Sequence, residues 1–281
     1  MGTEIAALGI DAGSTTTKIV GVTFSGTLDW HHLEPTDPAV EGQVKRFLEI
    51  ARRETGSAGL PLVSTGYGRN LVQPADRRVT EITCHARGVF REMGHGGTLI
   101  DIGGQDTKII IIDQDGNVKN FVMNDKCAAG TGRFLEVVAE RLRIPLDAMG
   151  EAALSSLDEA SISSTCTVFA ESEIVSLIAR GHPAEPIVRG LHRSLVRRIS
   201  ALAKTAGLTP PVMLSGGVAR NAAVREILSE ELGRDVLPSR HPQLVGAYGA
   251  ALIALGLPKT RQAETTPPVP ENSSCDSREH A

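Results

Sequence analysis

The sequence contains no run of about 18 apolar residues, which is the length that a membrane-spanning helix needs. The apolar stretch near its start is short, ends at Asp11 and follows no basic segment, so it indicates a buried strand rather than a signal peptide. Basic residues are not in surplus, because 29 Lys and Arg stand against 33 Asp and Glu, for a formal net charge of -4. Since nucleic-acid-binding proteins gather basic residues, this balance does not favour such a partner. We expect a cytoplasmic globular protein that binds neither membranes nor nucleic acid.

Cysteine is scarce as well, with four residues in a chain of 281, namely Cys84, Cys127, Cys166 and Cys275. Without a signal peptide we expect no disulfide framework, which leaves reduced thiols for metal or redox chemistry. Cys127 and Cys166 stand 39 positions apart, unlike the closely spaced pairs of zinc sites. We expect Cys84 to be a buried apolar side chain on a helix. Cys275 falls in the segment 258–281, whose proline, serine and charge content predicts disorder.

A strand, a glycine turn and a second strand occur in this order twice along the chain. The first copy starts at residue 5 and the second spans 97–113, and an Asp closes the first strand of each copy, at Asp11 and Asp101. The chain is long enough for two such halves, each with a core. The repeat therefore predicts two halves that face each other across a cleft, with a nucleotide held by one turn from each half. Apolar periodicity predicts helices at 40–55, 80–93 and 246–256. It also predicts one helix after Cys127, one after Cys166, and one that follows the glycine turn within 212–221 and runs to about residue 232.

The two turns carry groups that hold phosphate and magnesium. Backbone amides of a tight turn, together with Ser and Thr hydroxyls, cradle phosphate oxygens, and an acidic residue at the strand end positions a hydrated Mg²⁺. Gln105 is placed to orient an attacking water, as glutamines do in other nucleotide hydrolases. A third glycine turn lies within 212–221, and the P-loop motif is absent. The alternative is that these segments are ordinary glycine-containing hairpins with no role in phosphate binding. Three such turns in one chain make that alternative less favoured. The residues concerned are Asp11, Gly13, Ser14, Thr15, Thr16 and Lys18 in the first turn, and Asp101, Gly103, Gly104 and Gln105 in the second.

The two middle cysteines each precede a predicted helix. Cys127 lies in NDKCAAGTG and Cys166 in SSTCTVF. Near a helix N-terminus the dipole and free amides lower the pKa of a thiol and stabilise anionic ligands. Two thiolates are too few for a cluster that takes four, but a two-fold dimer would bring two pairs together on its axis. On the residues alone, the alternative that both cysteines are small buried apolar side chains stays open.

Six segments together resemble a known family. They are similar to the activator proteins of 2-hydroxyacyl-CoA dehydratases and to the ATP-binding subunits of benzoyl-CoA reductases, and the resemblance runs from about residue 5 to about residue 256. The two cysteine segments are its specific part, because the phosphate turns alone fit any member of the acetate kinase, sugar kinase, Hsp70 and actin superfamily. The segments are GIDAGSTTTK, TGYGRN, DIGGQDTK, NDKCAAGTGRFLE, SSTCTVFAESE and LSGGVARN.

The resemblance implies an α/β fold of duplicated ribonuclease H-like domains, as in actin. The first half would cover 1–93 and be completed by a helix at about 243–257 that packs back, and the second would cover 94–242. Cys127 and Cys166 from each of two identical subunits would ligate one bridging [4Fe-4S] cluster. ATP and Mg²⁺ would bind between the halves, with Asp11, Asp101 and Gln105 as catalytic residues. The first turn would hold phosphates, the second would face the γ-phosphate and Mg²⁺, and the adenosine would be bordered by Gly216, Gly217, Asn221 and Gln243.

The same resemblance implies a function and partners. ATP hydrolysis would drive a low-potential electron from the cluster of a homodimer to a 2-hydroxyacyl-CoA dehydratase component, with ferredoxin or flavodoxin as the electron donor. The first alternative is the electron-activation subunit of a benzoyl-CoA (arene) reductase. A small-molecule kinase of the same fold, which has no use for two cysteines at helix starts, is a more distant alternative. Another is a nucleotide-dependent actin-like scaffold, which would polymerise with ATP.

Overall fold

The computed structural model describes residues 4–56, 59–162 and 166–256, so the predicted disordered segment with Cys275 lies outside the described residues. Nowhere in these three ranges is there a helix whose length and apolar content would let it cross a bilayer. The strands are β1 (Ile5–Ala12), β2 (Thr16–Thr23), β3 (Leu28–Pro35), β4 (Leu62–Thr65), β5 (Arg77–Arg78), β6 (Gly97–Ile102), β7 (Thr107–Ile112), β8 (Val118–Asn124), β9 (Val212–Ser215) and β10 (Val236–Pro238). The α-helices are α1 (Val40–Thr55), α2 (Glu81–Met93), α3 (Gly132–Leu142), α4 (Met149–Leu154), α5 (Thr167–Ala179), α6 (Ala184–Ala206), α7 (Ala222–Leu232) and α8 (Val245–Leu255). Short 3₁₀ turns are η1 (Arg69–Leu71), η2 (Ala128–Gly130), η3 (Leu146–Ala148) and η4 (Gly217–Arg220).

The strands form two five-stranded sheets with the same topology. The first has the order β3-β2-β1-β4-β5, and the second, read from its other edge, has the order β8-β7-β6-β9-β10. In the first sheet β1 pairs antiparallel with β2 and parallel with β4, and in the second β6 pairs in the same two ways with β7 and β9. The predicted fold class, an α/β fold of duplicated ribonuclease H-like domains, is therefore confirmed.

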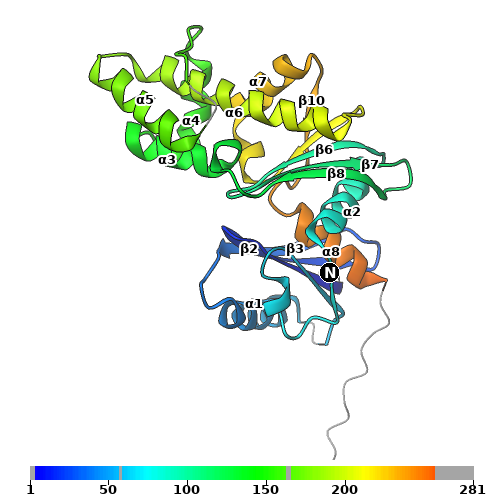
Figure 1. Ribbon diagram of the computed structural model, residues 1–281. Helices are drawn as coiled ribbons and strands as arrows, with labels where there is room; N and C mark the ends of the chain where they lie inside the picture. The colour runs from blue at the N-terminus through cyan, green and yellow to red at the C-terminus, as the bar shows by residue number, and fades with distance from the viewer. Residues whose placement is uncertain (1–3, 57–58, 163–165, 257–281) are drawn as a thin grey trace, which may run out of the picture.

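Helices cover both faces of each sheet, which explains why the central strands are apolar along their whole length. In the first sheet Leu8, Ile10 and Ile19 pack against Phe47 of α1, and the opposite face packs against α8. In the second sheet one face packs against α3, α6 and α7, and the other against α2 and the first residue of α8. The order of layers is helix, sheet, the pair α2 and α8, sheet, helices (Figure 1).

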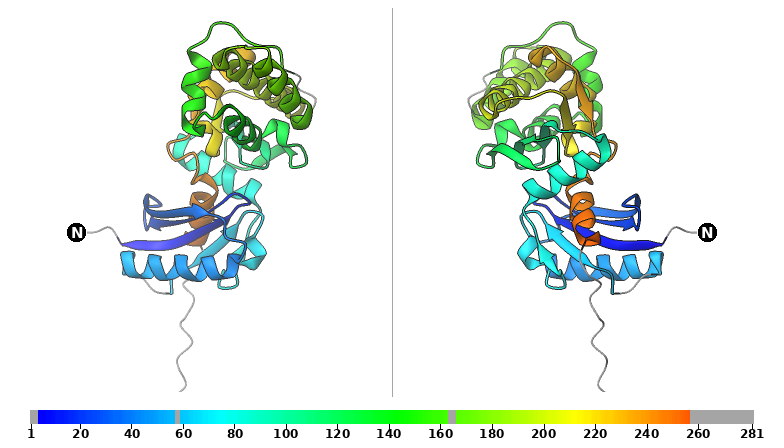
Figure 2. Two further views of the ribbon diagram at one scale, coloured as in Figure 1. Left: turned by 90° about the vertical axis from the view of Figure 1, so that its left-hand side faces the viewer. Right: turned by 90° about the vertical axis from the view of Figure 1, so that its right-hand side faces the viewer.

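The helices α2 and α8 lie side by side between the two sheets (Figure 2). They approach so closely that a Cβ at Gly249 would collide with the backbone of Cys84, and one at Gly88 would collide with Val245. α8 also contacts β1, β2 and β4 of the first sheet, although it is the last helix described in the chain. The two halves are thus joined through a layer in which glycine and alanine permit backbone contact.

The predicted elements agree with the structure where local signals are strong. α1 has the predicted bounds, with Val44, Phe47 and Ala51 buried on one face. Thr80 caps α2 by accepting a hydrogen bond from the amide of Thr83, and Asn221 caps α7 in the same way through Val224. The 23-residue helix α6 was not predicted, although its buried residues form much of the second core.

Candidate functional site

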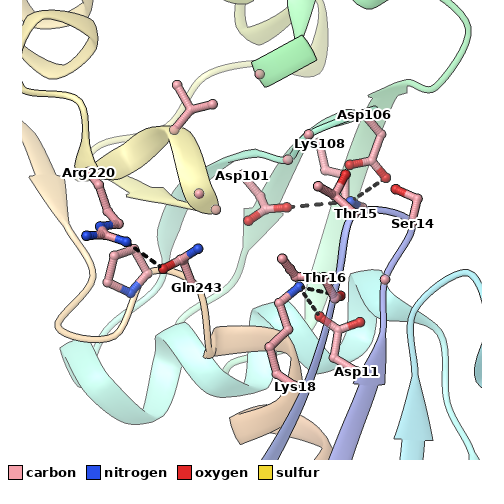
Figure 3. Close-up of a pocket in the computed structure, with 18 of the residues that line it drawn as sticks. Asp11, Ser14, Thr15, Thr16, Lys18, Asp101, Asp106, Lys108, Arg220 and Gln243 are labelled. Carbon is pink, nitrogen blue, oxygen red and sulfur yellow. Dashed lines mark hydrogen bonds and ion pairs between the residues drawn. The ribbon is translucent and has the colours of Figure 1, made fainter. Parts of the chain in front are cut away.

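A cavity of about 760 Å³ lies between the two halves, which is within the range of small-molecule sites. Residues from the glycine turns of both halves line it (Figure 3). Side chains of α2 and α3 line it as well. Of the residues predicted to contact nucleotide or to act in catalysis, those at the cavity are Asp11, Gly13, Ser14, Thr15, Thr16, Lys18, Asp101, Gly103, Gly104, Gly216, Gly217, Asn221 and Gln243. Gln105 is not among the lining residues, and its side chain is exposed.

The first turn connects β1 to β2 and is held by a threonine from the end of β3. The Thr36 hydroxyl donates to the Gly13 carbonyl at 2.7 Å, and the Thr36 amide donates to the Thr15 carbonyl at 3.0 Å. Lys18 lies opposite Asp11 in the strand register, and its Nζ is 3.4 Å from Asp11 Oδ2. The turn therefore presents a fixed backbone and a lysine–aspartate pair to the cavity.

The second turn repeats this arrangement in the other half. Lys108 lies opposite Asp101 in the register of β6 and β7, and its Nζ is 3.5 Å from Asp101 Oδ2. The Gly103 amide donates to the Asp106 carbonyl at 2.9 Å, which closes the turn. The two turns meet at Gly104, where a Cβ would collide with the Thr15 side chain of the first half. Glycine at this position lets the two phosphate turns approach each other.

Lys108 is the centre of a buried group of charges. It is 3% exposed, and its Nζ is 2.7 Å from Asp106 Oδ2 and 3.5 Å from both Asp101 Oδ2 and Glu81 Oε2. Burial alone disfavours an ammonium ion, but the three carboxylates outweigh it and hold the pKa of Lys108 above its ordinary value. Burial raises the pKa of Glu81 above its usual value, although Lys108 opposes this shift. The group places one buried lysine among three carboxyl groups in the lining of the cavity.

Asp101 remains ionised in spite of its burial. Burial would raise its pKa, but the His85 ring, the Lys108 ammonium and the Ser215 hydroxyl together hold that pKa below the ordinary value. Ser215 Oγ donates to Asp101 Oδ1 at 2.6 Å, and His85 Nε2 lies 3.5 Å from the same oxygen. His85 Nδ1 donates to the Glu81 carbonyl at 2.8 Å, which fixes the ring. A buried ionised carboxylate of this kind suits a hydrated divalent cation.

The third turn borders the opposite end of the cavity. Gly216 has φ +88°, and a Cβ there would collide with the Ile102 backbone, so glycine is required for the turn to lie over the second sheet. The side-chain amide of Asn221 is fixed by two hydrogen bonds. Its Oδ1 accepts from the backbone amide of Val224, and its Nδ2 donates to His192 Nε2 at 2.9 Å. Burial lowers the pKa of His192, so its ring stays neutral and can accept this bond.

Both cysteines of the predicted cluster are half-buried, whereas Cys84 is fully buried. Burial raises the pKa of Cys84 to about 12, which makes it unreactive. Cys166 is the N-cap residue of α5, as predicted. Cys127 instead caps the 3₁₀ turn η2, and α3 begins five residues later. The first amides of α3 are occupied, because Gly132 and Arg133 donate to the carbonyls of Gly103 and Gly104 at 2.8 Å each. The expectation that free helix amides surround Cys127 was therefore wrong for α3.

Within the described ranges, no group of three or more His, Cys, Asp or Glu side chains is placed to hold a metal ion. A single copy of the chain accordingly brings no complete set of cluster ligands together in this part of its structure. The two cysteines supply at most two ligands to any shared site.

Several residues that line the cavity were not predicted to belong to it. A usable signal exists for Lys108, since the spacing Asp-x-Gly-x₃-Thr-Lys occurs both at 11–18 and at 101–108. Seven of the others lie within the six segments quoted above, although no role in the cavity was predicted for them: Tyr67, Asp106, Gly132, Leu135, Glu136, Val218 and Arg220. The remaining five lie outside those segments, and only packing of the folded chain brings them to the cavity: Glu81, His85, Leu146, Asp147 and Pro242.

Comparison with known proteins gives consistent matches along nearly the whole chain. Residues 8–254 match the family described as the BadF/BadG/BcrA/BcrD ATPase family. An activator of lactoyl-CoA dehydratase from Anaerotignum propionicum is 43% identical over 250 residues, which cover 88% of this chain and 96% of that protein. A benzoyl-CoA reductase component from Thauera aromatica is 32% identical over 197 residues, which cover 68% of this chain and 70% of that protein.

A solved structure has the same architecture. The activator of the 2-hydroxyisocaproyl-CoA dehydratase from Clostridium difficile, determined with bound ADPNP, superimposes with a TM-score of 0.83 at 41% sequence identity. The match covers 89% of this chain and 94% of that one.

Proposed function

The chain belongs to the BadF/BadG/BcrA/BcrD ATPase family, and from this membership we propose that it couples ATP hydrolysis to electron transfer in the cytoplasm. Two copies would share one [4Fe-4S] cluster, held by Cys127 and Cys166 of each copy. The electron acceptor would be a 2-hydroxyacyl-CoA dehydratase component, since relatives at about 41–43% identity carry the name of dehydratase activators. A ferredoxin or flavodoxin would supply the electron.

The cavity between the halves fits Mg²⁺ and ATP. Asp11 and Asp101 offer hard oxygen ligands to a hydrated Mg²⁺, and residues of the first two turns line the space for the phosphates. Lys18 supplies positive charge from the first half, and Gly216, Gly217, Asn221 and Gln243 would border the adenosine. The ADPNP-bound structure of the relative from Clostridium difficile supports nucleotide binding by this fold.

A hydrogen-bonded path between the second phosphate turn and the Cys127 loop is the observation that carries the proposal. Gly132 and Arg133 donate to the carbonyls of Gly103 and Gly104, as described above. In addition, the Thr107 hydroxyl donates to the Gly130 carbonyl at 2.5 Å, and the Gly130 amide donates to the Cys127 carbonyl at 3.4 Å. A displacement of the second turn by the γ-phosphate therefore shifts the backbone that carries Cys127.

The donor set fits an iron–sulfur cluster only when two copies of the chain combine. Thiolates are the ligands of [4Fe-4S] clusters, which take four of them. Each chain offers two half-buried thiols, Cys127 and Cys166. A two-fold axis between copies doubles this number without any further residue.

The surface of α5 supports a contact with another protein close to Cys166. Val168 and Phe169, the second and third residues of this helix, are 65% and 63% exposed, and Val175 and Ile178 are also exposed. Val168 and Phe169 are adjacent exposed apolar residues within three positions of Cys166, and exposed apolar surface is typical of protein–protein contacts. We propose that a second copy of the chain and the acceptor protein meet at this end of α5.

When bound, the cluster would supply the low-potential electron, and the chain's own residues would control when it leaves. Lys18 and Lys108 balance the carboxylates of the cleft, and the two turns close on the phosphates. Hydrolysis releases the γ-phosphate. The second turn, α3 and the Cys127 loop would then return together to the positions they held before ATP bound. This order of events makes each transfer irreversible.

Gln105 is proposed to orient the attacking water, and its replacement tests that role. Its exposed side chain lies between Gly104, which contacts Thr15, and Asp106, which pairs with Lys108. Gln105→Ala is expected to bind ATP as the wild type does but to lower kcat by about 10²-fold, as loss of a positioning group does. Steady-state ATPase assays and ATP-binding calorimetry measure the two effects. Gln114→Ala, at an exposed site in the next turn, is the control. Unchanged kcat in Gln105→Ala would exclude Gln105 from the mechanism.

Iron analysis of anaerobically purified protein tests the proposed function directly. We expect about four iron and four sulfide per dimer, a dimer on size exclusion, and loss of the visible absorption within minutes of exposure to air. Protein purified in air should still bind ATP. An iron-free anaerobic preparation with full ATPase activity would leave an ATPase without an electron-transfer role.

The arene reductase alternative rests on the match to the benzoyl-CoA reductase component from Thauera aromatica. The two roles differ in stoichiometry, because a dehydratase recycles the electron whereas an arene reductase consumes it. Mixing the reduced protein with a purified 2-hydroxyacyl-CoA dehydratase should give many turnovers per ATP hydrolysed. A fixed ATP consumption at every turnover would favour the reductase.

A further inference from the structure

The two cysteines differ in the source of positive charge beside their sulfur atoms. Cys166 is the N-cap of the 13-residue helix α5, whose dipole points its positive end at that residue. Cys127 has no such helix, because the first amides of α3 donate to Gly103 and Gly104. The positive end of α3 is therefore directed at the phosphate turn rather than at Cys127.

Beside Cys127 the positive charge comes from a guanidinium group instead of a helix N-terminus. Arg198 is half-buried on α6, and its Nη1 donates to Cys127 Sγ at 3.5 Å. The stem of Arg198 lies across the cysteine loop at Gly130, where a Cβ would come within 3.1 Å of Arg198 Cδ. Asn124 holds the loop from its other side, accepting from the Cys127 amide and donating to its carbonyl. Glycine at position 130 leaves room for the stem of Arg198 and for the side-chain amide of Asn124 against the loop.

Arg198 also differs from the other arginines in the middle of α6. Arg193 pairs with Glu159 at 3.1 Å and with Glu230 at 2.8 Å, and Arg197 lies 3.9 Å from Glu159. Among the residues that the structure describes, no carboxylate forms an ion pair with Arg198, so its charge is not neutralised there.

We propose that Arg198 is a positioning residue for the Cys127 ligand, which fixes the sulfur and supplies the positive charge that raises the reduction potential of the shared cluster. This inference rests on the proposed function. The reduced cluster carries one more negative charge than the oxidised cluster, so a cation near a ligand sulfur stabilises the reduced form. Hydrogen bonds to ligand sulfurs act in the same direction. Because both copies contribute an Arg198, the cluster has two such cations.

The test compares three variants of the anaerobic dimer by redox titration monitored through the electron paramagnetic resonance of the reduced cluster. In Arg198→Gln, the ratio of reduced to oxidised cluster at a fixed potential is expected to fall about tenfold, which for one electron is a potential lower by about 59 mV. Arg198→Lys keeps the charge and is expected to stay within about threefold of the wild type. Arg197→Gln removes the same charge one residue away and is expected to leave the potential unchanged.

The inference is overturned if Arg197→Gln shifts the potential as much as Arg198→Gln, or if Arg198→Lys behaves as Arg198→Gln. If Arg198→Gln is isolated without iron, iron retained after chemical reconstitution becomes the readout, at matched melting temperature and ATP binding. Iron retained by Arg198→Lys and lost by Arg198→Gln supports the role, and equal loss in Arg197→Gln overturns it. A wild-type dimer without iron refutes the proposed function and this inference together, whereas a wild-type cluster insensitive to Arg198 refutes the inference alone.

Discussion

Cys127→Ala and Cys166→Ala are each expected to give a dimer that binds ATP but has lost its iron. In a two-fold assembly one substitution removes two of the four thiolates, and a [4Fe-4S] cluster does not persist on two ligands. ATP-dependent electron transfer should disappear in both variants. The nucleotide cavity should remain intact, because neither cysteine lines it.

Cys84→Ala is the matched control, since Cys84 is fully buried and burial raises its pKa to about 12. This variant should retain its iron and its visible spectrum. Iron and sulfide determination with ATP-binding calorimetry on all three proteins separates loss of the cluster from loss of the fold. A full iron complement in Cys127→Ala or Cys166→Ala would show that the assigned residue is not a ligand.

The substitution Lys108→Met is expected to destabilise the protein by about 3–5 kcal/mol at neutral pH, because it removes one partner from a buried ion cluster. Lys108 is 3% exposed and is the cation between Asp101, Asp106 and Glu81. Without it three carboxylates face one another at the base of the cavity. Urea unfolding measures the free energy, with Lys119→Met at an exposed position of β8 as the control. A loss of less than about 1 kcal/mol would contradict the role assigned to the cluster.

The pH dependence of that variant has a definite sign. In the wild type the pKa of Asp101 is held below its ordinary value, so its contribution is present above the unfolded pKa and is lost only in acid. In Lys108→Met the burial that raises the pKa of Glu81 is no longer opposed by the lysine, so this pKa rises further above its ordinary value. Groups with raised pKa values stabilise the fold at low pH and lose that effect as the pH rises. The deficit should therefore be largest near pH 8 and shrink toward pH 5.

Local signals in the sequence were sufficient for many elements and for much of the cavity. The periodicity of 40–55 predicts α1 with its bounds, and the paired turns at Asp11 and Asp101 predict the duplicated sheets. Each turn is formed by residues adjacent in sequence, so its geometry follows from Gly13 or Gly103 and its flanking strands. This is why most residues expected around a nucleotide gather at one cavity.

The remainder depends on packing between distant segments. Glu81 and His85 join the cavity only because α2 is inserted between the sheets, and no spacing in the sequence indicates this position. Arg198 meets Cys127 across 71 positions of sequence, from a helix that was not predicted. The amides of α3 were expected near Cys127 but bind the second turn, since helix boundaries alone do not show which carbonyls lie opposite.

The contact of α8 with the first sheet has a consequence for how the protein is made. Ala7, Val20, Val22 and Val63 emerge from the ribosome early, yet the apolar face to which they belong is covered by residues 244–254. This face of the first sheet therefore stays partly exposed to solvent until residues 244–254 have been synthesised. The first half, whose strands come early in the chain, therefore completes its core only after the second half has been synthesised.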